Sequence, residues 1–318
     1  MTAVLAAASG LFTQSFVTAL LAGGVLASIP LMFTAVGEAI SERSGVLNIG
    51  LEGMMLVGAY TGFLGAYEAH SMWVGFLTGA LGGVVAAALM VVLSVRMGLD
   101  QIVIGIAITL AGEGITSVLQ QAQFGGAYPR LPAYPQVAIP GLDSIPILGK
   151  SLFDQPLVVY FGLGLVVAVA WMFSRTRWGL ELRAAGEKPE ALDAAGVSVL
   201  NTRSYATLAT GALAGVGGAY LSVIAAGTFT PFMTQGQGYM AIVIAMLARG
   251  RPVWVAVASF VFGISLSLST ALQLTGINIS ADVINMLPFA AIMLALVIFA
   301  RSAYLPPALA VPYVRGAR

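Results

Sequence analysis

The sequence predicts an all-α polytopic membrane protein with a single transmembrane domain over residues 1–318. The chain is 59% hydrophobic and only 8% charged, whereas soluble domains carry about 25% charged residues. Apolar runs of about 18 residues or more recur along the chain, and each is long enough to cross roughly 30 Å of hydrocarbon. Lys and Arg residues fall in alternate loops. Together these observations predict about nine transmembrane helices, within a range of eight to ten.

The predicted spans are apolar runs bounded by charges and by proline and glycine clusters. They lie near residues 12–37, 47–67, 72–95, 101–121, 156–173, 204–225, 237–248, 253–273 and 283–300. The seventh is too short to cross alone. The stretch before it, "GTFTPFMTQGQGYM", is expected to enter the membrane as broken or re-entrant backbone. Such backbone is tolerated where protein shields it or where it lines a cavity.

The basic residues predict the orientation of these spans. Twelve of the fourteen Lys and Arg residues fall on one side, and only Arg130 and Lys150 fall on the other. Cytoplasmic loops carry the excess of Lys and Arg, so the richer side is expected to be cytoplasmic. The amino terminus is then outside and the carboxyl terminus cytoplasmic. The first ten residues lack the basic start of a signal peptide and are expected to be mature sequence.

Two hydrophilic segments separate the spans. The outer one, 122–156, is rich in proline, which forbids a long helix and favours an extended surface segment. It is either a plain connector or a docking surface for an external partner. The inner one, 174–204, contains "KPEALDAAG", in which Pro189 stands early, acidic residues occupy the first turn and Gly196 follows the end. This pattern predicts a short cytoplasmic helix, which is either a solvated connector or a contact surface.

A weak internal repeat is also visible. Gly58-Ala59-Tyr60 and Gly218-Ala219-Tyr220 each end a glycine-rich stretch in a span that runs from inside to outside. Each span starts a group of four, so the sequence indicates a parallel repeat of four-helix halves. The alternative is that glycines recur simply because small residues let membrane helices pack closely.

Polar residues inside the spans are candidates for a substrate path, because charged groups there usually face an interior or water. Glu113 lies well inside the fourth span, and Asn48 and Glu52, four residues apart, are expected to share a helical face. Gln235 and Gln237 lie in the broken segment. A polar stripe is expected around Glu113, comprising Thr109, Thr116, Ser117 and Gln120. The alternative for each is an interhelical hydrogen bond or a buried ion pair, such as Glu52 with Arg43.

No enzyme site can be assembled from the sequence. "GVLNIGLEG" has spaced glycines, but no following Lys and Ser/Thr complete a phosphate loop. The chain has no cysteine and one histidine, His70, so no metal site and no cofactor are expected in it. The net charge of +1 indicates no nucleic-acid partner. If the protein moves a solute uphill, a separate chain must bind and hydrolyse ATP.

Three stretches resemble permease subunits of bacterial ABC importers for nucleosides, within the group that includes ribose and branched-chain amino-acid permeases. They are "GEAISERSGVLNIGLEGMMLVGAY", "GLDQIVIGIAITLAGEGIT" and "LRAAGEKPEALDAAGVSV", and the similarity runs across nearly the whole chain. The first resembles the shorter of two paired nucleoside-type permeases. Within it, "SERSGVLNIG" resembles the cytoplasmic entry to the first core helix of the translocation path.

The resemblance implies a multi-pass protein of the bacterial inner membrane that works with three partners. These are a second, non-identical permease, a cytoplasmic ABC ATPase and an external substrate-binding protein. The short inner helix then resembles the coupling helix that contacts the ATPase, and its residues are Glu187, Lys188, Pro189, Glu190, Ala191, Asp193, Ala195 and Gly196. One departure is Glu187-Lys188, where the family often has Asn or Asp.

Other functions stay open at this point. The same importer architecture could carry simple sugars or flavins, and nothing in the chain separates these solutes from nucleosides. A secondary transporter or channel working alone is a different class, disfavoured by the cytoplasmic helix and the parallel repeat. The scarcity of buried charged pairs argues further against a proton-coupled pump. A membrane-embedded enzyme is a third class, disfavoured because no nucleophile–base pair or metal set is present.

Overall fold

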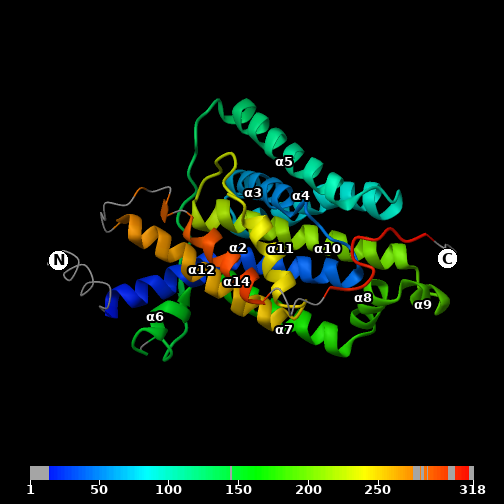
Figure 1. Cartoon of the computed structure of the whole chain (residues 1–318). Helices are drawn as coiled ribbons and strands as arrows, with labels where there is room; N and C mark the ends of the chain where they lie inside the picture. Colours follow the sequence, from blue (N-terminus) through cyan, green and yellow to red (C-terminus); the bar gives the residue numbers. More distant parts are fainter. Residues whose placement is uncertain are drawn as a thin grey trace.

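Figure 1 shows a computed structural model of the chain. The structure describes residues 14–143, 145–274, 280, 283–284, 286–299 and 305–314. The start of the first predicted span and the basic residues Arg301, Arg315 and Arg318 lie outside the described residues.

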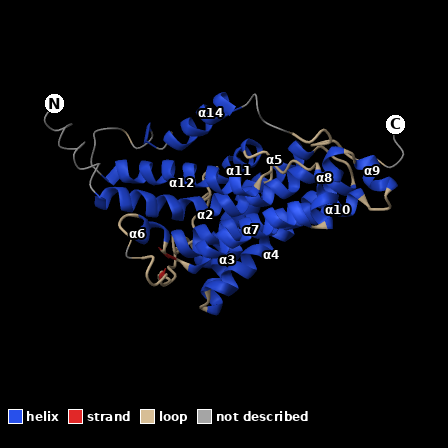
Figure 2. Ribbon diagram, turned by 90° about the horizontal axis from the view of Figure 1, so that it is seen from below, coloured by secondary structure: helices blue, strands red, loops and turns tan. Residues whose placement is uncertain are grey.

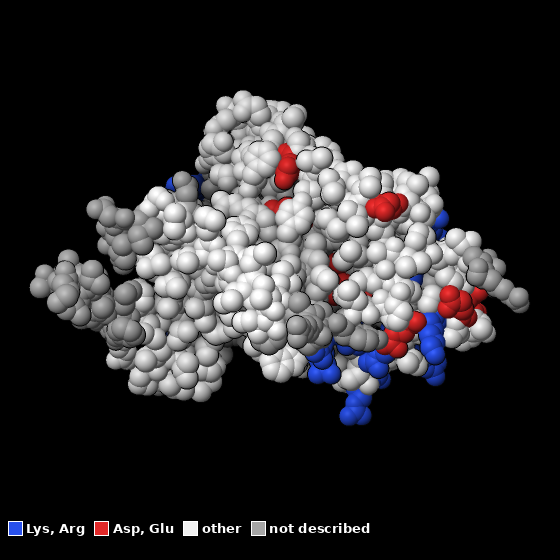
Figure 3. Space-filling view, in the orientation of Figure 1, with Lys and Arg blue, Asp and Glu red and all other residues white. Residues whose placement is uncertain are grey.

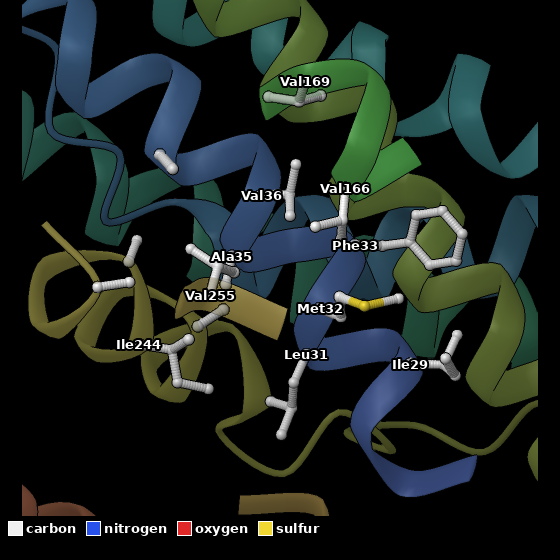
Figure 4. Close-up of a cluster of buried hydrophobic side chains, with 14 of the residues drawn as sticks. Ile29, Leu31, Met32, Phe33, Ala35, Val36, Val166, Val169, Ile244 and Val255 are labelled. Atoms are coloured by element: carbon white, nitrogen blue, oxygen red, sulfur yellow. The ribbon is translucent and has the colours of Figure 1, made fainter. Parts of the chain in front are cut away.

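Helix α2 (Gln14–Ser44) forms the centre of the structure. All its residues from 28 to 42 are buried, because helices surround it on every side. Figure 4 shows its apolar side chains between Val166 and Val169 of α7 (Leu157–Arg175) on one side and, on the other, Ile244 of α11 (Gln237–Leu247) and Val255 of α12 (Pro252–Leu274). In Figure 2, α12 runs alongside α2. A helix that is apolar all round and buried is the expected core of a large helical protein.

Helices α3 (Leu51–Ala69), α4 (Met72–Met90) and α10 (Val199–Tyr220) pack together at glycines. A Cβ atom added at Gly218 would overlap the Met55 carbonyl, and one at Gly58 would overlap the Gly215 backbone. Only small residues let helix backbones approach this closely. The two helices that carry the Gly-Ala-Tyr motifs, α3 and α10, are therefore direct neighbours. Whether they are copies of one unit stays a prediction.

The remaining helices surround this centre. Short π-helical segments continue α4 and α10, namely η1 (Val91–Arg96) and η2 (Leu221–Ala225). Helix α5 (Gln101–Phe124) lies along one edge of the molecule in Figure 1, and α14 (Leu287–Phe299) lies beside α12. In the described part of the chain, a helix therefore coincides with each predicted span.

Six of these helices are long and apolar enough to cross a membrane. They comprise α2, α4 with η1, α5, α7, α10 with η2, and α12. Helix α3 has 19 residues, but Glu52 and Glu68 make it less apolar. Because twelve of its residues are buried in protein, α3 has little need of a lipid-facing surface. The prediction of a polytopic helical membrane protein is confirmed.

The outer hydrophilic segment has no long helix among its described residues beyond the end of α5, and the inner one contains the expected short helix. In the outer segment a single-turn helix, α6 (Leu148–Leu152), lies between two short strands, β1 (Val137–Ala138) and β2 (Asp154–Gln155). The strands are antiparallel, with Val137 opposite Gln155. The inner segment forms α8 (Arg177–Glu187) and α9 (Pro189–Ala194), and α10 begins at Val199, five residues before the predicted start of that span.

Charged side chains are distributed unevenly over the surface. In Figure 3, Lys and Arg gather around the end of the molecule where Figure 1 places α8 and α9. This asymmetry is the pattern that the positive-inside rule produces when one end of the molecule faces the cytoplasm.

The glycine packing leads to a stability prediction. We expect Gly218→Ala to lower the melting temperature of the purified protein, because the added methyl would force α3 and α10 apart at a cost of ~1–3 kcal/mol. Gly114→Ala is the matched control, because nothing lies within 4 Å of a Cβ atom there. Equal melting temperatures for the two variants would contradict the packing account.

Candidate functional site

A cavity of about 720 Å³ lies between α2, the end of α10 with η2, α11, α12 and α14. This volume is within the range of roughly 300–1,000 Å³ that small-molecule sites occupy. No Asp, Glu, Lys or Arg is among its described lining residues. The wall instead presents amides, hydroxyls and two aromatic rings: Gln235, Gln237, Gln273, Ser267, Ser269, Thr270, Tyr220 and Phe289.

The broken segment before α11 brings two of the predicted path residues to this cavity. Residues 226–236 are not helical, which confirms the expectation of irregular backbone there. Phe232, Gln235 and Gly236 all have positive φ, at 61°, 47° and 83°. These left-handed turns reverse the chain, and the amide N–H of Gln237 donates to the Thr234 carbonyl at 2.9 Å. Gln235 and Gln237 consequently line the cavity.

Glu52 holds this broken segment in place. Its two carboxylate oxygens accept hydrogen bonds from the backbone N–H groups of Gly236 (2.7 Å) and Gly238 (2.6 Å). A Cβ atom added at Gly238 would lie 2.5 Å from the Glu52 Cα, so glycine is required for the approach. Glu52 lies in the first turn of α3, where the helix dipole favours a negative charge. The sequence alternative of an interhelical hydrogen bond fits this geometry.

Two polar atoms on the cavity wall have no hydrogen-bond partner among the described residues. They are the Tyr220 hydroxyl and the Gln237 Oε1, and both are buried. The Tyr220 side chain is only 1% exposed. An unsatisfied buried polar group costs roughly 1–3 kcal/mol. A polar solute in the cavity would offset that cost.

Asn48 lies in a turn and not in a helix, so the expectation that it shares a helical face with Glu52 is wrong. Helix α3 begins at Leu51. The Asn48 side-chain oxygen accepts from the Gly50 N–H at 3.1 Å, and its backbone N–H donates to Glu38 at 3.0 Å. Asn side chains favour such local turns over helices. Asn48 is fully buried and does not line the described cavity.

The polar residues of helix α5 differ in how deeply they are buried. Thr109, Thr116 and Gln120 are buried, with Thr109 beside α3 at the close contact with Gly53. Glu113 is half-buried, and its carboxylate has no hydrogen-bond partner among the described residues. It shares α5 with the exposed Leu110 and Ile115. The predicted stripe therefore lies on one side of α5, with Glu113 and Ser117 at its half-buried edge. Neither Glu113 nor Thr109 lines the described cavity.

The predicted coupling segment forms a docked surface helix. Pro189 occupies the first position of α9, Glu190 lies in its first turn, and Gly196 beyond its end has φ 83°. Pro189 and Leu192 are buried against the protein. The other predicted residues are exposed except for the half-buried Asp193: Glu187, Lys188, Glu190, Ala191, Ala195 and Gly196.

Arg203 is a buried connector that the sequence did not identify, because it was counted only as a cytoplasmic charge. Its guanidinium donates to the carbonyls of Ser44 at the end of α2 and Ala185 in α8. It also donates to two carbonyls of the carboxyl-terminal segment 305–314, Ala308 and Val311. Arg203 thus joins α10 to α2, to α8 and to the segment 305–314.

The chain is similar to permease components of ABC transporters. A family model described as branched-chain amino acid transport system permease component matches residues 20–299. A Haloferax volcanii protein provisionally named as a glucose ABC transporter permease is 35% identical over 89% of this chain and 85% of its own. A nucleoside ABC transporter permease of Lactococcus lactis is 32% identical, covering 93% and 97%. A guanosine ABC transporter permease of Bacillus subtilis is 33% identical, covering 91% and 94%.

The Glu52 contacts lead to a prediction about local stability. We expect Glu52→Ala to destabilise residues 232–238 by roughly 2 kcal/mol, because two charge-assisted hydrogen bonds are lost. Hydrogen–deuterium exchange of the Gly236 and Gly238 amides should then rise about thirtyfold. Glu68→Ala, on the exposed end of the same helix, should leave it unchanged. Unaltered exchange in Glu52→Ala would show that the carboxylate does not hold the segment.

Proposed function

The chain belongs to the family of branched-chain amino acid transport system permease components, and from this premise we propose that it carries nucleosides into the cell as part of an ABC importer. It is the transmembrane subunit, and ATP is bound by a separate chain. The cavity at Tyr220, Gln235 and Gln237 is the part of the path that this subunit supplies.

The uncharged, partly aromatic wall of the cavity is the observation that carries this proposal. A nucleoside has a flat base, polar base edges and a hydroxylated sugar, and it has no net charge. Phe289 offers a ring face, and the Tyr220 hydroxyl and the amides of Gln235 and Gln237 offer donors and acceptors. A transport path needs weak binding, and the absence of charged groups from the described lining fits that need.

A second solute class is favoured by one specific observation. The relative at 35% identity is provisionally named for glucose, and hydroxyl-rich sugars also suit amides and rings. Two relatives named for a nucleoside or guanosine cover more of both chains. We therefore place nucleosides first and simple sugars second.

We propose that the outer face of α5 contacts a second, non-identical permease. A lipid-facing helix normally carries apolar side chains alone, because a charged group at the bilayer centre costs about 2.5–3.5 kcal/mol on insertion scales. The Glu113 carboxylate has no polar partner within the described chain. A donor from the second subunit would satisfy it, and Glu113 would then face the path between the two subunits.

The surface of α9 is proposed to receive the cytoplasmic ATPase. Helix α9 is fixed from behind by Pro189 and Leu192 and presents Ala191 and Ala195 outward. Small outward residues leave room for a groove of the ATPase to close over the helix.

Under this proposal the end of the molecule with α8 and α9 faces the cytoplasm, and the protein lies in the inner membrane of a bacterium. The outer segment 122–156 would then face an external binding protein, and nine spans would give the two termini opposite sides.

Cavity variants test the proposed path. We expect Gln237→Leu and Tyr220→Phe each to lower nucleoside uptake at subsaturating concentration about fivefold, the effect of losing one hydrogen bond of ~1 kcal/mol. Membrane levels of the protein should not change, since neither group has a partner within the described chain. Gln121→Leu, on the exposed outer end of α5, is the control. Normal uptake by both cavity variants would place the path elsewhere.

Coupling variants test the role of α9. We expect Ala191→Arg or Ala195→Arg to abolish ATP-coupled uptake while the permease remains in the membrane, because a bulky charge blocks the docked surface. Ala69→Arg, at the end of α3, should retain uptake. Unchanged uptake in both α9 variants would show that this helix is not the coupling element.

Uptake of labelled nucleosides in cells with and without the gene tests the function itself. Loss of ATP-dependent nucleoside uptake on deletion is the expected result. ATP-dependent uptake of sugars or flavins would keep the importer and replace the solute. Uptake that collapses with the proton gradient and survives ATP depletion would contradict the ABC assignment.

A further inference from the structure

We propose that a cleft at the ends of α2, α8 and α11 binds the head group of an aminophospholipid, which carries both a phosphate and a primary ammonium group. The cleft has a volume of about 420 Å³. Its lining residues are Glu42, Arg43, Arg183, Glu187, Arg249, Gly250, Arg251 and Pro306. The inference concerns a lipid site and does not depend on which solute the protein transports.

The cleft lies at the level where membrane spans end. Arg43 is in the last turn of α2, Arg251 immediately precedes α12, and α7 ends at Arg175. All three helices are long and apolar enough to cross the membrane. Their common end therefore marks the membrane–water boundary.

Two exposed tryptophans support this position. Trp254 in the first turn of α12 is 57% exposed, and Trp171 in the last turns of α7 is 62% exposed. Tryptophan concentrates at the level of lipid head groups, because its ring is amphipathic. The ends of α7 and α12 thus carry side chains that favour contact with the head-group region.

Three arginines supply a site for the phosphate. Arg183, Arg249 and Arg251 are exposed, and none of their guanidinium groups has a hydrogen-bond or ion-pair partner among the described residues. They come from two separate elements, α8 and the turn between α11 and α12. Arginine is well suited to phosphate because its planar guanidinium donates two parallel hydrogen bonds.

A buried carboxylate supplies the complementary site for the ammonium group. Glu42 is only 4% exposed, lines the cleft, and its Oε1 atom has no hydrogen-bond partner among the described residues. Beside it the Arg43 guanidinium stacks on the Phe173 ring, 4.5 Å from the ring centre. A simple anion would satisfy the arginines and leave Glu42 unpaired. A head group with both charges satisfies both.

Lipid titration followed by native mass spectrometry of the purified full chain tests the proposal. The probes are phosphatidylethanolamine, phosphatidylglycerol, which lacks the ammonium group, and free phosphoethanolamine. We expect phosphatidylethanolamine to bind about tenfold more tightly than phosphatidylglycerol, a difference of ~1.4 kcal/mol. Free phosphoethanolamine should compete only weakly, because it lacks the acyl chains.

Variants separate the two halves of the site. Arg249→Gln combined with Arg251→Gln should weaken binding of both lipids about tenfold or more. Glu42→Gln should leave phosphatidylglycerol binding unchanged and remove the preference for phosphatidylethanolamine. Arg177→Gln is the control, because Arg177 is an exposed arginine on α8 outside the cleft. If the double variant does not fold, the exposed Arg183→Gln variant replaces it.

Several outcomes would overturn the proposal. They are unchanged lipid binding in the arginine variants, an equal loss in Arg177→Gln, and tight binding of free phosphoethanolamine without lipid selectivity. If the arginine variants bind lipid normally but no longer co-purify with the ATPase, the lipid proposal is wrong and the cleft is instead a contact for the cytoplasmic partner.

Discussion

The pair of hydrogen bonds from Gly236 and Gly238 to the Glu52 carboxylate is the interaction on which the cavity depends. Irregular backbone inside a membrane must have its N–H and C=O groups satisfied by the protein. The segment before α11 meets this requirement in part through Glu52, whose carboxylate oxygens lie 2.6–2.7 Å from the backbone nitrogens of Gly236 and Gly238. Because this contact fixes the segment, Gln235 and Gln237 stay at the wall of the cavity.

Close helix packing makes that contact available. Glycines let α3 approach both α4 and α10 until the backbones touch, as at Gly58 and Gly215, which buries Glu52 and places it beside the start of α11. Near the start of α10, Arg203 joins this helix to the end of α2, to α8 and to the segment 305–314. Under the proposed function, α9 and the cavity wall are therefore connected through α10, which carries Arg203 near one end and Tyr220 at the other.

The sequence predicted the helices and the short surface helix well, because apolar length and terminal residues such as Pro189 and Gly196 are local signals. The irregular segment before α11 was also predictable from its length and glycines. Local signals do not identify the partner of a polar group, because that partner can lie far away in the sequence. The sequence places Glu52 in a solute path, whereas its hydrogen bonds are to backbone 184 and 186 residues away. Asn48 was placed in a helix because spacing alone does not show that its side chain forms a turn. Tyr220 was noted only as part of a repeat, since nothing local indicates that it borders a cavity.

Photo-crosslinking of an azido-nucleoside to the reconstituted importer during ATP turnover tests the central claim, that the cavity beside the Glu52-held segment is the solute path. The account predicts labelled peptides from residues 220–240 and 266–273, with labelling suppressed by excess unlabelled nucleoside. Competitor-sensitive labelling confined to other helices, with none in these peptides, would contradict it.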